Sequence, residues 1–114
     1  PEEFGGAGLI LFKPEHVDMI LSGRKTQTRR IWKKPRAKVG AVHLAKTKML
    51  SREYFAKLTI LDVYREFPSD ISDDDARAEG YDDASAYSAA FCRINHLSAI
   101  PDKTVFVVKF EVIE

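Results

Sequence analysis

Cysteine is nearly absent from this sequence, since Cys92 is the single one among 114 residues. A lone cysteine forms no internal disulfide, so the fold has to rest on packing, and we expect Cys92 to be a small core residue of a helix. The apolar runs are far shorter than the roughly 20 residues that a membrane-spanning helix needs. The first residues also lack the pattern of a signal peptide. We therefore expect a cytoplasmic protein without a membrane partner.

Metal-binding and phosphate-binding motifs are missing as well. The three histidines, His16, His43 and His96, lie far apart, and no His or Cys pair has metal-ligand spacing. No phosphate loop or dinucleotide fingerprint occurs. We expect no metal and no nucleotide cofactor, and we expect each histidine to be a surface or partly buried side chain rather than a ligand.

Acidic residues are absent between Asp18 and Glu53, where eleven Lys and Arg residues occur, although the net charge of the chain is only +1. The density is highest in residues 23–38, where eight of sixteen residues are cationic. Concentrated positive charge attracts polyanions, and Trp32 offers a ring on which a base can stack. A solvated basic face that only keeps the protein soluble is the plainer interpretation.

Short hydrogen-bonding side chains interrupt this basic stretch at residues 26–28, which suits a phosphate or a base edge. The stretch therefore predicts a surface for a polyanion such as RNA. The predicted nucleic-acid-binding residues are Arg24, Lys25, Gln27, Arg29, Arg30, Trp32, Lys33, Lys34 and Arg36.

Hydrophobic periodicity and turn residues predict the order of strands and helices. We expect strands at residues 9–12, 26–31, 41–45, 58–64 and 104–113, a helix from Pro14 to Ser22 ended by Gly23, a helix capped by Ser72 and ended by Gly80, and a helix capped by Asp82 or Asp83. In the strand over 26–31, Thr26, Thr28 and Arg30 share one face, and Gln27, Arg29 and Ile31 share the other.

Length and composition indicate one domain over residues 9–114, preceded by a disordered N-terminal segment over residues 1–8. Strands and helices do not alternate as in a parallel α/β sheet. We predict an α+β, mainly β fold: a small mixed or antiparallel β-barrel with two or three flanking helices. One hydrophobic core should contain Val17, Ile20, Leu58, Ile60, Phe91, Phe106, Val108 and Phe110.

Glu79 is an unusual charge because it falls in the last turn of a predicted helix, where it opposes the helix dipole. A surface salt bridge or simple solvation would explain it without function. The functional interpretation is that Glu79 approaches the basic stretch and pairs with Lys25 or Arg30.

The motif formed by Gly23, Lys25, Thr26, Thr28 and Arg30, followed later by Ala76, Glu79 and Gly80, resembles an ASCH domain of the PUA-like group. The resemblance extends over most of the chain, from Leu9 to Ile113. It implies a β-barrel of five or six strands with a cleft, lined by this motif, that binds RNA. Many ASCH proteins carry Glu at the position of Thr28, and the KKPRAK loop is longer here than in the smallest members.

Some small ASCH proteins hydrolyse acylated cytidines with a Lys, a Thr and a Glu, which correspond to Lys25, Thr28 and Glu79, and others are ribonucleases. The chemistry requires a Lys with a lowered pKa to activate the Thr hydroxyl, and the neighbouring cations favour that. Glu79 would orient the Lys or protonate the leaving amine, and Arg30 would hold a phosphate or an oxyanion. Three alternatives thus remain: a monomeric RNA-binding domain, a metal-independent amidohydrolase or ribonuclease, and a module that binds an acidic protein partner.

Overall fold

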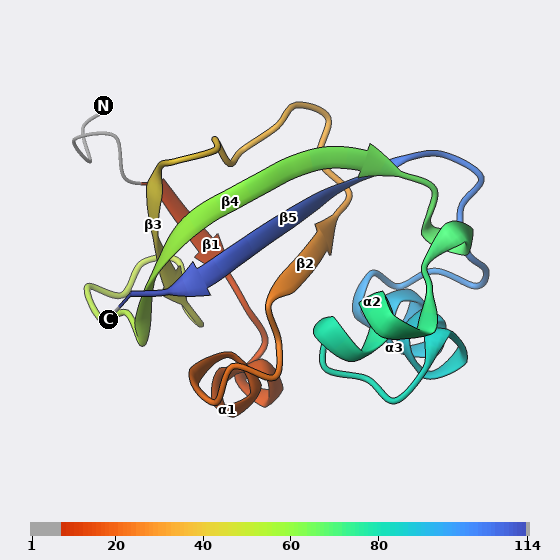
Figure 1. Cartoon of the computed structure of the whole chain (residues 1–114), viewed down its shortest axis with the longest axis horizontal. Coiled ribbons are helices and arrows are strands. Elements are labelled where there is room, and N and C mark those ends of the chain that lie inside the picture. The colour runs from red at the N-terminus through yellow and green to blue at the C-terminus, as the bar shows by residue number, and fades with distance from the viewer. Residues whose placement is uncertain (1–7, 114) are drawn as a thin grey trace.

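The computed structural model describes residues 8–113 and contains five strands, three α-helices and two 3-10 turns in the order shown in Figure 1. The elements are β1 (Gly8–Leu11), η1 (Pro14–His16), α1 (Val17–Leu21), β2 (Gln27–Arg30), β3 (Val42–Lys46), β4 (Ala56–Glu66), η2 (Pro68–Asp70), α2 (Asp73–Ala78), α3 (Ala84–Ile94) and β5 (Val105–Val112). The predicted N-terminal segment falls almost wholly on residues 1–7, outside the described part. Gly8 already belongs to β1 and pairs with His43.

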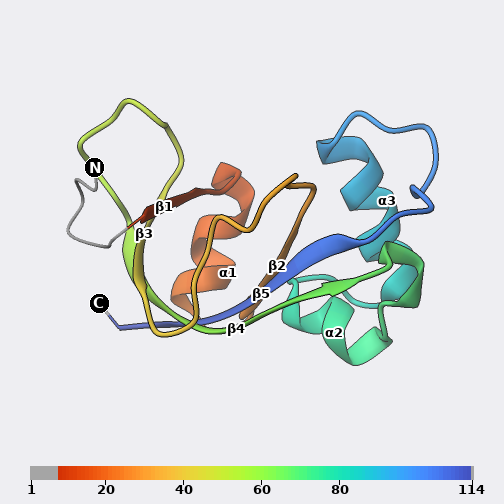
Figure 2. The same cartoon turned by 90° about the horizontal axis from the view of Figure 1, so that it is seen from above.

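All five strands form one sheet in the order β1-β3-β4-β5-β2, in which only β1 and β3 run parallel. The pairing of β4 with β5 shifts register between Ile60 and Asp62, and such a bulge bends a strand and increases its twist. The sheet consequently curls into a half-barrel around α1, which is visible from above in Figure 2. This architecture confirms the predicted mainly β fold with flanking helices.

The two edge strands, β1 and β2, are not paired with each other through their backbones. Arg30 joins them instead, because its Nη2 donates a hydrogen bond to the Leu11 carbonyl oxygen at 2.6 Å. The same guanidinium lies over the ring of Phe12, 4.9 Å from its centroid. The open side of the half-barrel is thus closed by a side chain rather than by a ladder of backbone hydrogen bonds.

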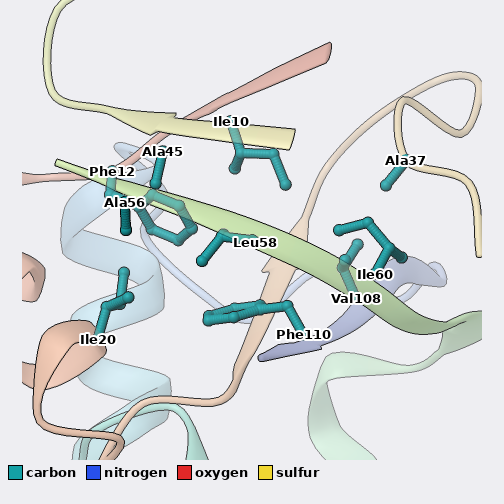
Figure 3. Packing of buried hydrophobic residues seen from close by; sticks show 10 residues of the cluster. All are labelled: Ile10, Phe12, Ile20, Ala37, Ala45, Ala56, Leu58, Ile60, Val108 and Phe110. Carbon is teal, nitrogen blue, oxygen red and sulfur yellow. The ribbon is translucent and has the colours of Figure 1, made fainter. Parts of the chain in front are cut away.

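The buried apolar residues form two clusters, so the prediction of a single core is wrong. The first fills the inside of the curl, as Figure 3 shows, and contains Ile10, Phe12, Ile20, Ala37, Ala45, Ala56, Leu58, Ile60, Val108 and Phe110. The second joins α2 and α3 to the sheet through Ile71, Ala76, Tyr87, Phe91 and Val105. Val17 is only half-buried, and Phe106 is buried but belongs to neither cluster.

The alternation of side chains along β5 explains the two clusters. Val108 points into the half-barrel. Val105 is three residues away on the same strand, so it points to the opposite face, where α2 and α3 pack. The sheet therefore carries helices on separate faces, and Figure 1 shows α2 and α3 together at one end of β4 and β5.

The helix ends follow the predicted signals. The Ser72 side chain accepts a hydrogen bond from the Asp75 N–H at the start of α2, and Asp83 does the same for Ala86 in α3. Gly80 follows α2 with a φ of +103°, and Gly23 follows α1 with a φ of +83°. Within residues 8–113, no helix has the length and apolar character needed to cross a membrane.

Candidate functional site

A cavity of about 440 Å³ lies where the ends of β1 and β2 meet α3 and the segment after α2. Its volume falls within the range of small-molecule sites. The lining residues are Leu11, Phe12, Lys13, Pro14, His16, Lys25, Thr28, Arg29, Arg30, Thr47, Glu79, Tyr81, Tyr87, Phe91, Ile94 and Asn95. The three residues predicted as catalytic, Lys25, Thr28 and Glu79, all belong to this lining.

Lys25 and Glu79 form a buried ion pair at the cavity, which agrees with the functional interpretation of Glu79 and not with a surface salt bridge or simple solvation. Lys25 is 2 % exposed and Glu79 is 3 % exposed. Lys25 Nζ donates to Glu79 Oε1 and to the Glu79 carbonyl oxygen, both at 2.9 Å. Burial lowers the pKa of Lys25, the charge of Glu79 opposes this, and the charges of Arg30 and Arg29 lower the pKa further. The ammonium group is therefore easier to deprotonate than a surface lysine.

Of the two cations proposed for Glu79, Lys25 pairs with it and Arg30 does not; the second cation on Glu79 is Arg29, which the sequence did not indicate. Arg29 Nη1 donates to Glu79 Oε2 at 2.9 Å, and its Nη2 donates to Glu66 Oε1 at 2.8 Å. Arg29 and Gln27 share one face of β2, and Gln27 bonds to both Arg29 and Asp75. Burial by itself would lower the pKa of Arg29, but the carboxylates of Glu79 and Glu66 outweigh this effect and raise the pKa above its usual value.

Arg30 lies on the opposite face of β2 and has no carboxylate partner among residues 8–113. Its Nε donates to Thr28 Oγ1 at 2.9 Å, and its other contacts are the Leu11 carbonyl oxygen and the Phe12 ring. Burial lowers the pKa of Arg30 to about 10, so the guanidinium is still charged at pH 7. The cavity wall thus contains a half-buried cation whose contacts within residues 8–113 are with neutral protein groups.

The charge of the lining is strongly unbalanced. Four cationic residues, Lys13, Lys25, Arg29 and Arg30, face a single carboxylate, Glu79. The remaining wall is largely aromatic and apolar, so the cavity combines flat stacking surfaces with positive charge. Such a lining suits a ligand that has both a planar ring and an anionic or electron-rich group.

Thr28 has a different hydrogen-bond partner from the one that the predicted trio requires. Its hydroxyl oxygen accepts from Arg30, and within residues 8–113 it has no direct hydrogen bond to Lys25 or Glu79. Thr28 is 4 % exposed and lines the same cavity as the ion pair. A ligand in the cavity would therefore contact the hydroxyl and the ion pair from a common side.

The predicted nucleic-acid-binding residues separate into four groups, of which the first is Lys25 and Arg30 in the cavity lining. Gln27 and Arg29 are buried and bonded to protein carboxylates. Trp32 is half-buried against Phe106, with ring centroids 6.0 Å apart. The exposed cations are Arg24, which approaches Asp82 at 3.4 Å, and the loop residues Lys33, Lys34 and Arg36.

Sequence patterns missed the aromatic side of the cavity. His16 Nε2 and the Tyr81 hydroxyl are 2.9 Å apart, and both residues line the cavity. Tyr87 also lines it, is 3 % exposed, and its hydroxyl has no hydrogen-bond partner in the described part of the chain. A signal was available for Tyr81 alone, since it follows Glu79 and Gly80 directly. No periodicity connects His16 with a residue 65 positions away.

Across the described residues, no group of three or more His, Cys, Asp or Glu side chains lies close enough together to hold a metal ion.

Comparison with known proteins identifies the fold. No family model matches the chain, and no curated protein matches it in sequence. Among solved structures, the ASCH domain of Lactobacillus crispatus is similar over 97 % of this chain and 82 % of its own, with a TM-score of 0.72 and 17 % identity. A DUF984 protein from Enterococcus faecalis is similar over 94 % of this chain and 80 % of its own, with a TM-score of 0.63 and 19 % identity.

A third similar structure is a mutant form of an ASCH protein from Zymomonas mobilis. The similarity covers 93 % of this chain and 69 % of that protein, with a TM-score of 0.66 and 13 % identity.

Proposed function

Because the chain has the fold of an ASCH domain, we propose that it binds RNA or a modified nucleoside by taking one nucleoside into the cavity beside Lys25. The observation that carries this proposal is Arg30, a half-buried guanidinium without a carboxylate partner in the described chain. Partial desolvation of a cation without a counter-charge is costly, and an anionic or electron-rich ligand group would compensate it. The aromatic walls would hold the base.

The exposed loop after β2 would hold the backbone of an RNA strand. Lys33 follows Arg30 by three residues, so their Cα atoms are at most about 10 Å apart. Lys33, Lys34 and Arg36 are all exposed. We assign phosphate contact to these three residues, and we assign Gln27 and Arg29 to holding the carboxylates in place. The predicted cytoplasmic location and monomeric state stay predictions from the sequence.

Salt dependence and a blocked cavity test this proposal together. If about four phosphates are neutralised, the logarithm of affinity for single-stranded RNA should fall against the logarithm of salt with a slope near 3. Replacing Lys33, Lys34 and Arg36 together by Ala should flatten that slope.

Filling the cavity separates base binding from phosphate binding. Ile94→Trp on α3 should weaken RNA binding about tenfold or more, because Ile94 lines the cavity, while leaving the slope unchanged. Ala89→Trp is the matched control, because it places the same new side chain at an exposed position of the same helix. A slope indistinguishable from zero rejects RNA binding, and full affinity in Ile94→Trp rejects the cavity as the base site.

A second candidate, metal-independent hydrolysis of an acylated cytidine, is favoured by the position of Lys25, Glu79 and Thr28 around one cavity. Neutral Lys25 would take the Thr28 proton as Thr28 Oγ1 attacks the amide carbonyl carbon. The C–N bond then breaks, and the amine of cytidine takes that proton from Lys25. Water hydrolyses the acyl-Thr28 ester and releases the acid. Arg30 Nε, already bonded to Thr28 Oγ1, would stabilise negative charge on that oxygen.

The pH profile and two isosteric variants test the hydrolysis. Release of cytidine from acylated cytidine without added metal should increase with pH as Lys25 loses its proton. Thr28→Val should abolish turnover with little loss of binding, and Glu79→Gln should slow turnover and shift the pH profile. Undiminished activity in Thr28→Val removes Thr28 as the nucleophile, and no turnover at any pH leaves only the binding function.

A further inference from the structure

His16 and Tyr81 form a contact to which neither proposed function gives a role. His16 comes from the turn before α1, and Tyr81 comes from the segment between α2 and α3. The His16 Nε2 to Tyr81 hydroxyl distance is 2.9 Å, and the rings meet edge to face with centroids 6.0 Å apart. Both side chains line the cavity, and Tyr81 is only half-buried, so its hydroxyl side can meet a ligand.

Both members of this pair are neutral near pH 7. Burial lowers the pKa of His16 to about 4, and the charge of Lys25 adds to this effect. Burial likewise raises the pKa of Tyr81. The pair is therefore a neutral polar part of a lining that also contains the charged side chains of Lys13, Lys25, Arg29, Arg30 and Glu79.

The direction of the hydrogen bond depends on which ring nitrogen of neutral His16 carries the proton. A neutral imidazole nitrogen is a stronger acceptor than a phenol oxygen, and a phenol O–H is the stronger donor. In the tautomer that carries its proton on Nδ1, His16 Nε2 accepts from the Tyr81 hydroxyl, and the inference below rests on this tautomer. The hydroxyl proton is then committed to the imidazole, so the Tyr81 oxygen offers a lone pair to the cavity and acts there as an acceptor.

We propose that Tyr81 is the residue that selects the base in the cavity, accepting a hydrogen bond from an exocyclic amino group, and that His16 is the positioning residue that fixes the direction of the Tyr81 hydroxyl. This inference rests on the proposed binding of a nucleoside in the cavity. A carbonyl oxygen in place of the amino group would meet a lone pair, so bases with an oxo group at that position bind less well.

Matched nucleoside pairs test the inference directly. Cytidine differs from uridine, and adenosine from inosine, by replacement of an exocyclic amino group by an oxo group. The wild-type protein should bind the amino member of at least one pair about twofold to tenfold more tightly, the range of one net hydrogen bond. Titration calorimetry with the four nucleosides measures these ratios.

Tyr81→Phe removes only the hydroxyl and should bring the affinity ratio to about 1. His16→Gln should also reduce the ratio, since the hydroxyl can then rotate, and adding it to Tyr81→Phe should change the ratio no further. Tyr64→Phe is the matched control, because Tyr64 lies outside the cavity lining and should keep the wild-type ratio.

The outcomes separate the two ideas. A wild-type ratio that Tyr81→Phe leaves unchanged overturns the inference and leaves nucleoside binding intact, and so does a wild-type ratio of 1 for both pairs. If the wild-type protein binds none of the four nucleosides, the proposed function and this inference are both overturned. Loss of the ratio in Tyr81→Phe, with the ratio kept in Tyr64→Phe, supports both.

Discussion

Breaking the Lys25–Glu79 ion pair should destabilise the protein far more than breaking an ion pair at its surface. The pair is almost fully buried, with 2 % and 4 % of the two side chains exposed. Removing one partner of such a pair leaves an uncompensated charge in the interior, which typically costs about 3–5 kcal/mol. The protein provides its own comparison, because Arg24 and Asp82 form a pair at 3.4 Å with 52 % and 91 % of their side chains exposed.

The contacts of each residue determine the order of the effects. Lys25→Met leaves Glu79 with its second partner, Arg29, so the free energy of unfolding should fall by about 3 kcal/mol. Glu79→Gln leaves Lys25 without a carboxylate partner in the described chain and removes one of the carboxylates of Arg29, which keeps Glu66, so the loss should lie nearer to about 5 kcal/mol. The double variant should lose less than the two single losses combined, with a coupling energy of about 2 kcal/mol.

Urea unfolding, followed by circular dichroism, measures the four free energies of this double-mutant cycle. Sucrose in all samples would keep Glu79→Gln folded, since small domains are stable by only about 5–15 kcal/mol. The same cycle with Arg24→Met and Asp82→Asn should give a coupling energy of at most about 1 kcal/mol. A coupling energy for Lys25 and Glu79 no larger than this control would refute the assignment of a strong interior ion pair.

Three further predictions concern stability. Gly80→Ala should lower the free energy of unfolding by about 1–2 kcal/mol from its φ of +103° alone, and by more because the new Cβ would lie 2.5 Å from Met19 Sδ. Gly23→Ala is the control in the same urea assay. Its new Cβ would meet nothing within 4 Å, so it should show only the backbone effect. The pKa of His16 is lower in the folded state than the ordinary 6.5, because burial favours the neutral imidazole. The folded state therefore has its full stability above pH 6.5 and loses part of it as the pH falls toward 4, where the unfolded chain binds a proton that the folded chain does not. At about 1.4 kcal/mol per pKa unit the loss is about 3 kcal/mol, and an unchanged pH dependence in His16→Gln would contradict it. Ser72→Ala should cost about 1 kcal/mol in thermal or urea unfolding, through the lost cap of α2.

Local sequence signals were sufficient for the parts of the fold that depend on near neighbours. Helix caps, glycine stops and the alternation along β2 are decided within a few residues, and the structure confirms them at Ser72, Gly23 and Gly80. The odd placement of Glu79 at a helix end also indicated a compensating cation, and Lys25 provides it.

The parts that sequence could not give depend on how distant elements pack. Alternation shows that Arg29 and Arg30 face opposite sides of β2, but the position of α2 decides which of them meets Glu79. The separation of the apolar residues into two clusters likewise follows from helices packing on different faces of the curled sheet. The contact between His16 and Tyr81 exists only once both segments have reached the cavity.

The carboxylate contacts of Arg29 also bear on the order of folding. They join residues 37 and 50 positions apart, and the Lys25–Glu79 contact spans 54 positions. Such contacts form only after long loops have closed, whereas the caps of α2 and α3 need a single turn of chain. The ion pairs around the cavity should therefore be largely absent from the folding transition state. Substitutions there should mainly accelerate unfolding and leave the folding rate nearly unchanged, so the cavity lining governs how long the folded state persists.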